Sequence, residues 1–435
     1  MADVRPFRGV RYAGTTSLDD LVAPPYDVLS AEQAGRLRAR SPFNAVHIDL
    51  PVGPGEPPDE AAYRCAADTF ATWRRQGILQ REAEPAVYLV DQTYRGPDGR
   101  ERTRRGFVAR LVLADLADRV VLPHEKTHAG PKADRLALYR AARADLSQIF
   151  LLYPDADGRV ADVLAAAAAA LGADQVSEAR DADGNTHRIG PVYGERAARI
   201  AALLGNQTLY IADGHHRYET ALAYRDERRA LGDHSADTMM VYLCGMDDPG
   251  LTVFPTHRLL RGVEVPPMAV AIERLRPVFD LLPQTAVGRS ECELLMARRL
   301  EAGVDDGKVF GLYFPREEAC ALLRLRDLSA LDRLVAEGFS AEAAQLNVTI
   351  LHYLILRDAF GVGVGHTEDT IDYVSDIPEA FVRLATGEYA MGAFIDSTLV
   401  SEVKSIADQA ETMPQKSTYF YPKLLTGLVY DALGD

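Results

Sequence analysis

Hydrophobic positions along the chain follow the period of a strand in some segments and that of a helix in others, which predicts a mixed α/β protein. Two alternating runs, Ala86 to Tyr94 and Arg102 to Leu113, surround the turn residues 96–99 and predict a β-hairpin. Helical periodicity predicts a helix ending near Arg75 and helices over residues 132–144, 160–171, 195–204 and 348–360. Shorter apolar runs predict strands over residues 45–50, 148–153, 207–212, 239–244, 253–255, 309–314 and 321–325.

The first fifty residues contain a rigid extended segment, Pro24-Pro25-Tyr26-Asp27-Val28. Each proline fixes its own φ and disfavours helix in the residue before it. Ser30 has the side chain of a helix N-cap, so a short helix is expected to begin near Ala31.

The length of 435 residues suggests two or three domains at roughly 150 residues each. A new pattern of strands and helices begins near Val120, and another begins after Gly262. We therefore expect an N-terminal segment with the hairpin over residues 1–118, a middle core over 119–262 and a C-terminal α/β domain over 263–435.

Composition and charge narrow the class of protein. Apolar residues make up 47% of the chain, enough to offset the entropy of folding, so no long disordered stretch is expected. The net charge of −15 disfavours nucleic acid as a partner. The four cysteines form no CxxC pair, and no apolar run is long enough to span a bilayer. The chain is predicted to be cytoplasmic, without a membrane partner.

The junction Asp213-Gly214-His215-His216-Arg217 carries the strongest chemical signal, because it joins a short apolar strand to a helix. A helix N-terminus offers free N–H groups to phosphate, and Gly214 lets the backbone approach closely. Arg217 supplies a planar fork for phosphate oxygens, and the imidazoles of His215 and His216 can donate to phosphate or carry protons. Asp213 is suited to bind Mg²⁺ or to accept a hydroxyl proton. The alternative is an Asp N-cap followed by a solvated first turn.

The segment His124-Glu125-Lys126-Thr127-His128 matches the HExxH pattern of zinc hydrolases. That chemistry needs both histidines on one face of a helix, but Pro123 precedes the motif and Gly130-Pro131 follows it. We favour a loop that supplies Glu125, with Lys132 or Arg135 nearby, to a polar active site. A purely structural loop remains the alternative.

Residues 413–423, Met-Pro-Gln-Lys-Ser-Thr-Tyr-Phe-Tyr-Pro-Lys, are rich in donors and aromatic rings. Lys416 and Ser417 match the end of a phosphate-binding P-loop, but the glycines of that loop are missing. Lys416 and Ser417 are therefore candidates for binding an anion, and a packed aromatic arm is the alternative.

Five segments together resemble the domain-of-unknown-function family 1015 over nearly the whole chain. They are residues 5–7 (Arg-Pro-Phe), 24–28 (Pro-Pro-Tyr-Asp-Val), 123–127 (Pro-His-Glu-Lys-Thr), 213–218 (Asp-Gly-His-His-Arg-Tyr) and 413–420 (Met-Pro-Gln-Lys-Ser-Thr-Tyr-Phe). This resemblance adds Tyr26, Asp27 and His124 to the site candidates. The family name implies no activity.

The junction at 213–217 is also similar to the phosphate-binding turn of the ParB/sulfiredoxin-like superfamily, which includes free-serine kinases that use ADP or ATP. The resemblance implies an α/β fold with a mixed sheet, built as a ParB/sulfiredoxin-like core with an additional α/β domain. In the serine kinases an Asp-Gly-His-x-Arg turn lies at the active centre, and it maps here onto Asp213, Gly214, His215 and Arg217. Glu125 or Asp27 is our inference for the separate acidic residue of those enzymes. Sulfiredoxin activity is not expected, because His rather than Cys follows Gly214.

These observations predict a kinase that transfers phosphate from ATP or ADP, with Mg²⁺, to a small hydroxyl-bearing metabolite. The predicted catalytic residues are Asp213, His216 and Glu125, and free serine is the acceptor that the resemblance implies. One alternative is a nucleotide-binding regulatory protein with little turnover. The other is a zinc-dependent hydrolase that uses His124 and His128.

Overall fold

The computed structural model of the protein describes residues 1–53, 59–96, 98–125, 129–301, 308–363 and 370–434. The chain forms two units, each with its own sheet, and the units are described separately. Unit 1 contains residues 1–123, 127–252 and 422–435, and unit 2 contains residues 124–126 and 253–421.

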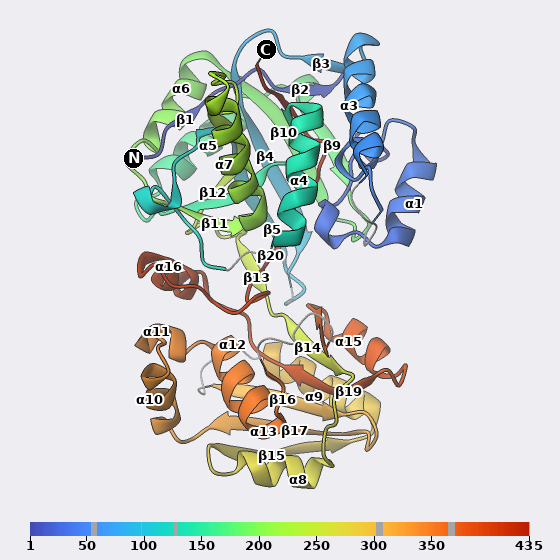
Figure 1. The fold of residues 1–435 in the computed structure, drawn as a ribbon, viewed down its shortest axis with the longest axis vertical. Helices are drawn as coiled ribbons and strands as arrows, with labels where there is room; N and C mark the ends of the chain where they lie inside the picture. Colours follow the sequence, from blue (N-terminus) through green and yellow to red (C-terminus); the bar gives the residue numbers. More distant parts are fainter. Residues whose placement is uncertain (54–58, 97, 126–128, 302–307, 364–369, 435) are drawn as a thin grey trace. The chain divides into compact units, whose positions relative to one another are not determined.

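A mixed sheet forms the centre of unit 1, and among the described residues it has nine strands (Figure 1). Its order is β6-β11-β8-β12-β5-β4-β10-β9, with β1 added against β5. The pairs β11–β6 and β12–β8 are parallel, and the other pairs are antiparallel. The strands are β1 (Val4–Arg5), β4 (Ala86–Arg95), β5 (Glu101–Val112), β6 (Val121–Leu122), β8 (Ile149–Tyr153), β9 (Ser177–Arg180), β10 (Thr186–Tyr193), β11 (Leu209–Asp213) and β12 (Thr238–Gly245).

Helices and short strands surround this sheet. The helices are η1 (Tyr26–Val28), α1 (Ala31–Arg40), α2 (Val46–Asp49), α3 (Glu60–Arg75), η2 (Leu116–Asp118), α4 (Ala129–Ala142), α5 (Arg159–Ala169), η3 (Ala173–Gln175), α6 (Gly194–Leu203) and α7 (His215–Ala230). The short strands are β2 (Val10–Tyr12) with β3 (Leu79–Arg81), and β7 (Ala144–Asp145) with β21 (Asp431–Ala432). Helix α4 packs against both α3 and α7 (Figure 1).

Alternate residues of the central strands build the hydrophobic core of unit 1, because successive side chains of a strand point to opposite faces. The buried side chains of α5 and α6 join this core. Members of the cluster include Leu89, Phe107, Ala109, Ile149, Leu151, Val241 and Leu243 from the strands and Val160, Leu164, Ala197 and Ile200 from the helices. The same pleat directs Gln92 and Arg104 to the opposite face, where both are fully buried.

The predicted hairpin, the predicted helix cap at Ser30 and the predicted helices of unit 1 are confirmed. The hairpin forms as β4 and β5, paired from Tyr88–Val108 to Arg95–Glu101. Ser30 caps α1 in a capping box with Gln33. The predicted helices of unit 1 form as α3, α4, α5 and α6, within a few residues of the expected bounds.

The strand predicted over Ala45 to Leu50 is wrong, because residues 46–49 form the short helix α2. The alternation of Val46, Ile48 and Leu50 fits a strand as well as a single buried helical turn. The side chain of Asn44 decides between them, since its Oδ1 accepts from the N–H of Val46 and its amide donates to main-chain oxygens of Asp20 and Val22. A hydrogen bond from a side chain to the backbone two residues later favours a turn and competes with the pairing of strands in a sheet.

Unit 2 has a second sheet, ordered β15-β17-β16-β19-β14-β18 among the described residues, with every pair antiparallel. Its strands are β14 (His257–Arg261), β15 (Phe279–Val287), β16 (Val309–Phe314), β17 (Ala319–Leu325), β18 (Ile371–Val374) and β19 (Tyr389–Phe394), and β13 (Thr252–Phe254) pairs with β20 (Tyr419–Tyr421). Its helices are α8 (Met268–Leu275), α9 (Arg289–Glu301), α10 (Ser329–Ala336), α11 (Ala341–Ala344), α12 (Asn347–Ile350), α13 (Asp358–Phe360), α15 (Ile377–Leu384) and α16 (Val400–Asp408). The helix predicted over residues 348–360 forms as α12 and α13 joined by a π-helical segment, η4 (Leu351–Arg357).

The mixed α/β class predicted from the sequence is confirmed. The division into segments 1–118, 119–262 and 263–435 differs from the structure, because β4 and β5 share one sheet with β8, β11 and β12. In addition, the last fourteen residues belong to unit 1 rather than to the C-terminal unit. Among the described residues no helix has the length and hydropathy needed to cross a membrane.

Candidate functional site

The β11–α7 turn has the geometry that the sequence predicted. Strand β11 ends at Asp213, Gly214 adopts a left-handed conformation with φ 94°, and α7 begins at His215. A Cβ on residue 214 would lie 2.8 Å from Cγ2 of Ile149. Both the positive φ and the close contact therefore require glycine here. The first N–H groups of a 16-residue helix follow directly, and such groups attract anions.

Arg217 holds this turn together from within the protein. Its side chain is only 7% exposed; Nη1 donates to the main-chain oxygen of Gln148 at 2.5 Å, and Nη2 to Asp213 Oδ2 at 3.2 Å. Burial by itself lowers the pKa of Arg217, but the surrounding acidic groups, first Asp213, outweigh burial. The pKa is therefore raised above its usual value, and the guanidinium stays charged. Direct binding of phosphate by Arg217 stays a prediction.

Lys423 is a residue of this site that we did not select from the sequence. Its Nζ lies 3.5 Å from Asp213 Oδ1, so the Asp213 carboxylate stands between two cations. The side chains of Lys423 and Asp213 are 14% and 26% exposed, which leaves both within reach of solvent. Lys423 is the last residue of the polar and aromatic segment 413–423, so the sequence did point to it. We selected Lys416 instead because it matches the lysine at the end of a P-loop.

A second group of charges, built around Asp49 and Arg135, lies in the same unit. Arg135 Nη1 donates to the main-chain oxygen of Asp49 at 2.7 Å and lies 3.3 Å from its Oδ1. The guanidinium carbon of Arg135 is 3.9 Å from the ring centroid of Tyr26. Burial raises the pKa of Asp49, and the charges of Arg135 and Arg217 act against that shift. Burial also raises the pKa of Tyr26 to about 12.

We did not select Asp49 as a site residue from the sequence, because a strand was predicted over residues 45–50. Thr426 Oγ1 donates to its second oxygen, Oδ2, at 3.1 Å. Both carboxylate oxygens of this buried group thus have partners, as a buried charge requires. The charges of Asp27 and Asp49 also act on Arg217, which brings the Pro24–Val28 segment into the electrostatic surroundings of the turn.

Gln148, the residue that accepts from Arg217, is a buried polar residue. The residue is 2% exposed, and its Nε2 donates to the main-chain oxygen of Leu425 at 3.1 Å. Among the described residues, its Oε1 has no hydrogen-bond partner. A buried oxygen left unpaired is costly, so this atom next to the Arg217 anchor marks a place where a donor from a ligand or water would stabilise the protein.

The remaining unit 1 candidates lie on α4 and α7. Lys132 forms an ion pair with Glu219, which links α4 to α7. His215 is 7% exposed, and His216 is half-buried, its main-chain oxygen accepting from Thr220 Oγ1 at 2.7 Å. The structure places Tyr26, Lys132, Arg135 and residues 213–217 in one unit, and their role as a site stays a prediction.

Four further candidates belong to unit 2, where two of the predicted motifs meet. Glu125 Oε1 accepts from the N–H of Ser417 at 3.1 Å, and His124 Nε2 lies 3.0 Å from Thr418 Oγ1. Lys416 adopts a positive φ of 54°, and its main-chain oxygen accepts from Thr256 Oγ1 at 2.6 Å. The structure thus shows Glu125 holding the loop of Lys416 and Ser417. The catalytic role of Glu125 stays a prediction.

Metal binding has little support in the described residues. Among them no group of three or more His, Cys, Asp or Glu side chains is arranged to hold an ion. His128, the second histidine of the zinc hypothesis, lies outside the described residues. For Mg²⁺, the Asp213 carboxylate already faces two cations, Arg217 and Lys423, which compete with a divalent ion. Asp213 alone therefore does not fit a magnesium site.

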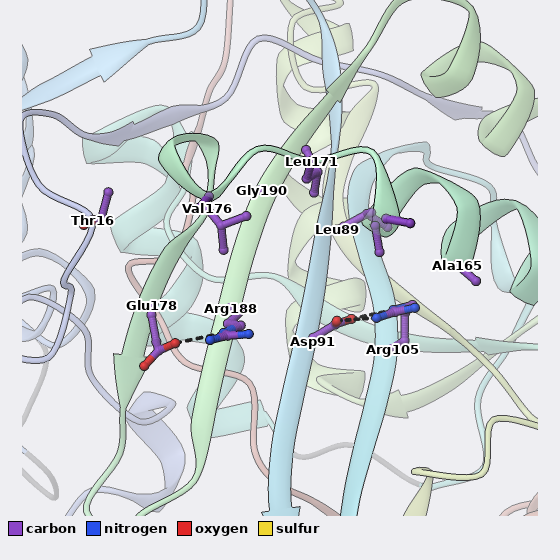
Figure 2. Close-up of a pocket in the computed structure, with 13 residues that line it drawn as sticks. Thr16, Leu89, Asp91, Arg105, Ala165, Leu171, Val176, Glu178, Arg188 and Gly190 are labelled. Atoms are coloured by element: carbon purple, nitrogen blue, oxygen red, sulfur yellow. Dashed lines mark hydrogen bonds and ion pairs between the residues drawn. The ribbon is translucent and has the colours of Figure 1, made fainter.

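A cavity of about 690 Å³ lies on the sheet of unit 1, away from the β11–α7 turn (Figure 2). Its lining includes two ion pairs, Asp91 with Arg105 at 2.6 Å and Glu178 with Arg188 at 2.8 Å. Alanines of α5 line it as well. None of the residues that the sequence predicted for the site lines this cavity.

The mixed sheet and the polar turn place the protein among α/β proteins with a candidate anion site at a helix N-terminus. Residues 4–349 match the family described as "Protein of unknown function (DUF1015)". The chain belongs to this family, as the sequence motifs predicted. No curated protein matches it.

Three solved structures illustrate what the chain is similar to. A free serine kinase in complex with AMP has a TM-score of 0.31 and 14% identity, covering 70% of this chain and 84% of that chain. A variant of free serine kinase in complex with ADP has a TM-score of 0.32 and 13% identity, and it covers 70% of this chain and 84% of that chain. A conserved hypothetical protein from Pyrococcus furiosus has a TM-score of 0.31 and 14% identity, and it covers 71% of this chain and 89% of that chain. At these TM-scores the likeness supports no argument about function, so we argue from this chain's own residues.

Proposed function

We propose that the protein transfers a phosphoryl group from a nucleotide to the hydroxyl of a small metabolite. The phosphates bind at the β11–α7 turn of unit 1, and Asp213 acts on the hydroxyl. Free serine is the predicted acceptor, from the resemblance of the turn. His216, Asp27, Glu125, Lys416 and Ser417 stay predicted participants.

One observation supports this proposal most: a partly exposed carboxylate stands at a helix N-terminus between a buried guanidinium and an ammonium. The N–H groups of α7 and the Lys423 ammonium attract a polyphosphate. The carboxylate of Asp213 repels phosphate but accepts a proton from a hydroxyl. A site with both properties suits a reaction in which a hydroxyl approaches a bound phosphate.

The reaction balances with the groups present. The hydroxyl oxygen of the acceptor forms a bond to the terminal phosphorus of the nucleotide, and its proton passes to the Asp213 carboxylate. The bond from that phosphorus to the bridging oxygen breaks, which releases ADP from ATP or AMP from ADP. Lys423 offsets negative charge on the phosphate oxygens, since phosphoryl transfer depends mainly on positioning and electrostatics. We derive no step through Mg²⁺.

The test is turnover with a panel of acceptors. The protein is incubated with ATP or ADP and with serine and other hydroxyl metabolites, with Mg²⁺ or with EDTA, and products are followed by ³¹P NMR. We expect a new phosphate ester, and Asp213→Asn lowers its rate by about 10²- to 10⁴-fold. Asp157→Asn is the matched control, because Asp157 is 59% exposed and pairs at the surface with Arg159.

Two results would contradict the proposal. Asp213→Asn with the turnover of the wild type would remove Asp213 from the chemistry. Tight nucleotide binding without product across the panel would favour a nucleotide-binding regulatory protein instead.

A further inference from the structure

We infer that Lys423 is the residue that contacts the anionic phosphates, and that a buried row of side chains, Arg104, Gln92 and His187 with Asp181, positions it. This inference rests on the proposed function, because it assigns the cation of the same site. It also names residues that are far from the turn in sequence. We call these four residues the buried row.

The buried row holds the main chain on both sides of the Lys423 Cα. Arg104 Nη2 donates to the main-chain oxygen of Pro422 at 2.5 Å, and Gln92 Nε2 donates to that of Lys423 at 3.1 Å. The two peptide groups that flank Lys423 are therefore fixed by side chains that are 0% exposed. Fixing the main chain limits where the ammonium can reach.

The buried row runs across three neighbouring strands. Gln92 on β4 lies directly opposite Arg104 on β5 and His187 on β10. Arg104 Nε donates to Gln92 Oε1 at 3.0 Å, and Gln92 Nε2 lies 3.1 Å from His187 Nδ1. Since the amide can only donate, His187 Nδ1 accepts and its Nε2–H faces Asp181.

Asp181 ends the buried row with a charge. Its Oδ2 lies 2.9 Å from His187 Nε2. Burial by itself raises the pKa of Asp181, but hydrogen bonds from His187 and Asn185 outweigh burial and lower it. Asp181 is thus ionised at neutral pH and fixes the orientation of the imidazole, which in turn fixes the amide of Gln92.

Aromatic rings lie against Arg104, at the β5 end of the buried row. The guanidinium carbon of Arg104 lies 4.6 Å from the ring centroid of Phe150 and 5.8 Å from that of Tyr242. A polar row in such apolar surroundings is rigid when its members are paired, because each alternative geometry leaves a buried group unpaired. The row is therefore suited to hold one lysine in one place.

The side chain of Lys423 extends from this fixed main chain to the turn. Its Nζ is 3.5 Å from Asp213 Oδ1, near the upper limit for a direct contact. The Lys423 side chain is 14% exposed, so an anion can reach the ammonium from solvent. A nucleotide polyphosphate at the N-terminus of α7 is the ligand class that this arrangement fits.

The first experiment observes the lysine directly. The chain has six lysines, at 126, 132, 308, 404, 416 and 423, so ¹³C-dimethylation, which keeps the charge, gives few NMR signals. The signal of Lys423 is assigned by its loss in Lys423→Arg. We expect ADP to shift the Lys423 signal and to leave that of Lys404 unchanged, because Lys404 pairs with Asp408 on α16 of unit 2.

The second experiment tests the buried row at its partly exposed end, Asp181, whose side chain is 13% exposed. Asp181→Asn removes the charge that orients His187 and keeps a similar shape. We expect a smaller ADP-induced shift of the Lys423 signal and a fall in kcat/KM of about 10-fold, with thermal stability measured alongside. Lys423→Met is expected to lower kcat/KM by about 10²-fold, with partial recovery in Lys423→Arg.

The outcomes separate this inference from the proposed function. Turnover by Lys423→Met at the wild-type rate overturns the role of Lys423 and leaves phosphoryl transfer standing. A Lys423 signal shifted by ADP, without product from any acceptor, supports Lys423 as the anion contact and overturns the kinase proposal. An ADP-induced shift of the Lys423 signal in Asp181→Asn equal to that in the wild type overturns the positioning role. Absence of nucleotide binding by the wild type overturns both.

Discussion

Nη1 of Arg217 donates a hydrogen bond of 2.5 Å to the main-chain oxygen of Gln148, a residue 69 positions earlier in the chain. The bond ties the first turn of α7 to the residue that precedes β8. Nη2 of the same guanidinium donates to Asp213 Oδ2, at the end of β11, at 3.2 Å. One buried cation therefore fixes the helix N-terminus relative to two neighbouring strands.

Arg217→Met is expected to lower the free energy of unfolding by about 3 kcal/mol, because it leaves buried partners unpaired. Urea denaturation followed by circular dichroism measures this. Arg229→Met is the control on the same helix, since the Arg229 side chain is 42% exposed and pairs with Asp237 at the surface. An equal effect of the two substitutions would show that Arg217 does not hold the turn.

Gly214→Ala is expected to cost more stability than Gly232→Ala. Both glycines have a positive φ, 94° and 74°, and alanine in that region costs about 1 kcal/mol. Only Gly214 has a neighbour where the new Cβ would lie, Ile149 Cγ2 at 2.8 Å, while Gly232 has open space. We expect a further loss of about 1–2 kcal/mol at Gly214, measured by urea denaturation. If the two variants lose the same amount, the close contact does not constrain the turn.

Asp145→Asn is expected to change how stability depends on pH. Burial, and after it the charge of Asp431, raises the pKa of Asp145 from 3.8 to about 7. The folded state therefore binds this proton more tightly than the unfolded state, so ionisation of Asp145 lowers the free energy of unfolding as pH rises from about 4 to about 7. The asparagine side chain of the variant does not titrate, so the stability of the variant relative to the wild type should rise over that range.

Thermal denaturation at several pH values measures this difference. Asp157→Asn serves as the control, since Asp157 is at the surface. Parallel curves for the wild type and Asp145→Asn would mean that the buried carboxyl titrates equally in the folded and unfolded states.

Glu125→Gln is expected to keep the stability of unit 2, and Glu125→Ala to lower it by about 1 kcal/mol. Glutamine retains an oxygen that can accept from the N–H of Ser417, now at 3.1 Å from Glu125 Oε1, and alanine does not. Urea denaturation compares the two variants. A loss in Glu125→Gln as large as in Glu125→Ala would show that the charge, rather than the acceptor, holds the loop. Loss of turnover in Glu125→Gln at unchanged stability would support the catalytic role predicted from the sequence.

Predictions from the sequence succeeded where neighbouring residues decide the structure. Ser30 and Gln33 cap α1 because a capping box needs only residues three positions apart. The hairpin of β4 and β5 follows from alternation around a glycine turn. The strand expected at residues 45–50 failed because its alternation is too short to separate a strand from one buried helical turn, and the bonds of Asn44 to distant main chain favoured the turn.

Local sequence alone predicts the β11–α7 turn, since a strand, a glycine and a helix that meet within five residues form their junction locally. It also identified the family through its motifs. Only the tertiary structure brought Lys423 to Asp213, across 210 positions, and placed Gln148 and Asp49 where they act on the same charges. Such partners depend on the order of strands in the sheet and on which face each side chain occupies, and no local pattern of residues encodes that order.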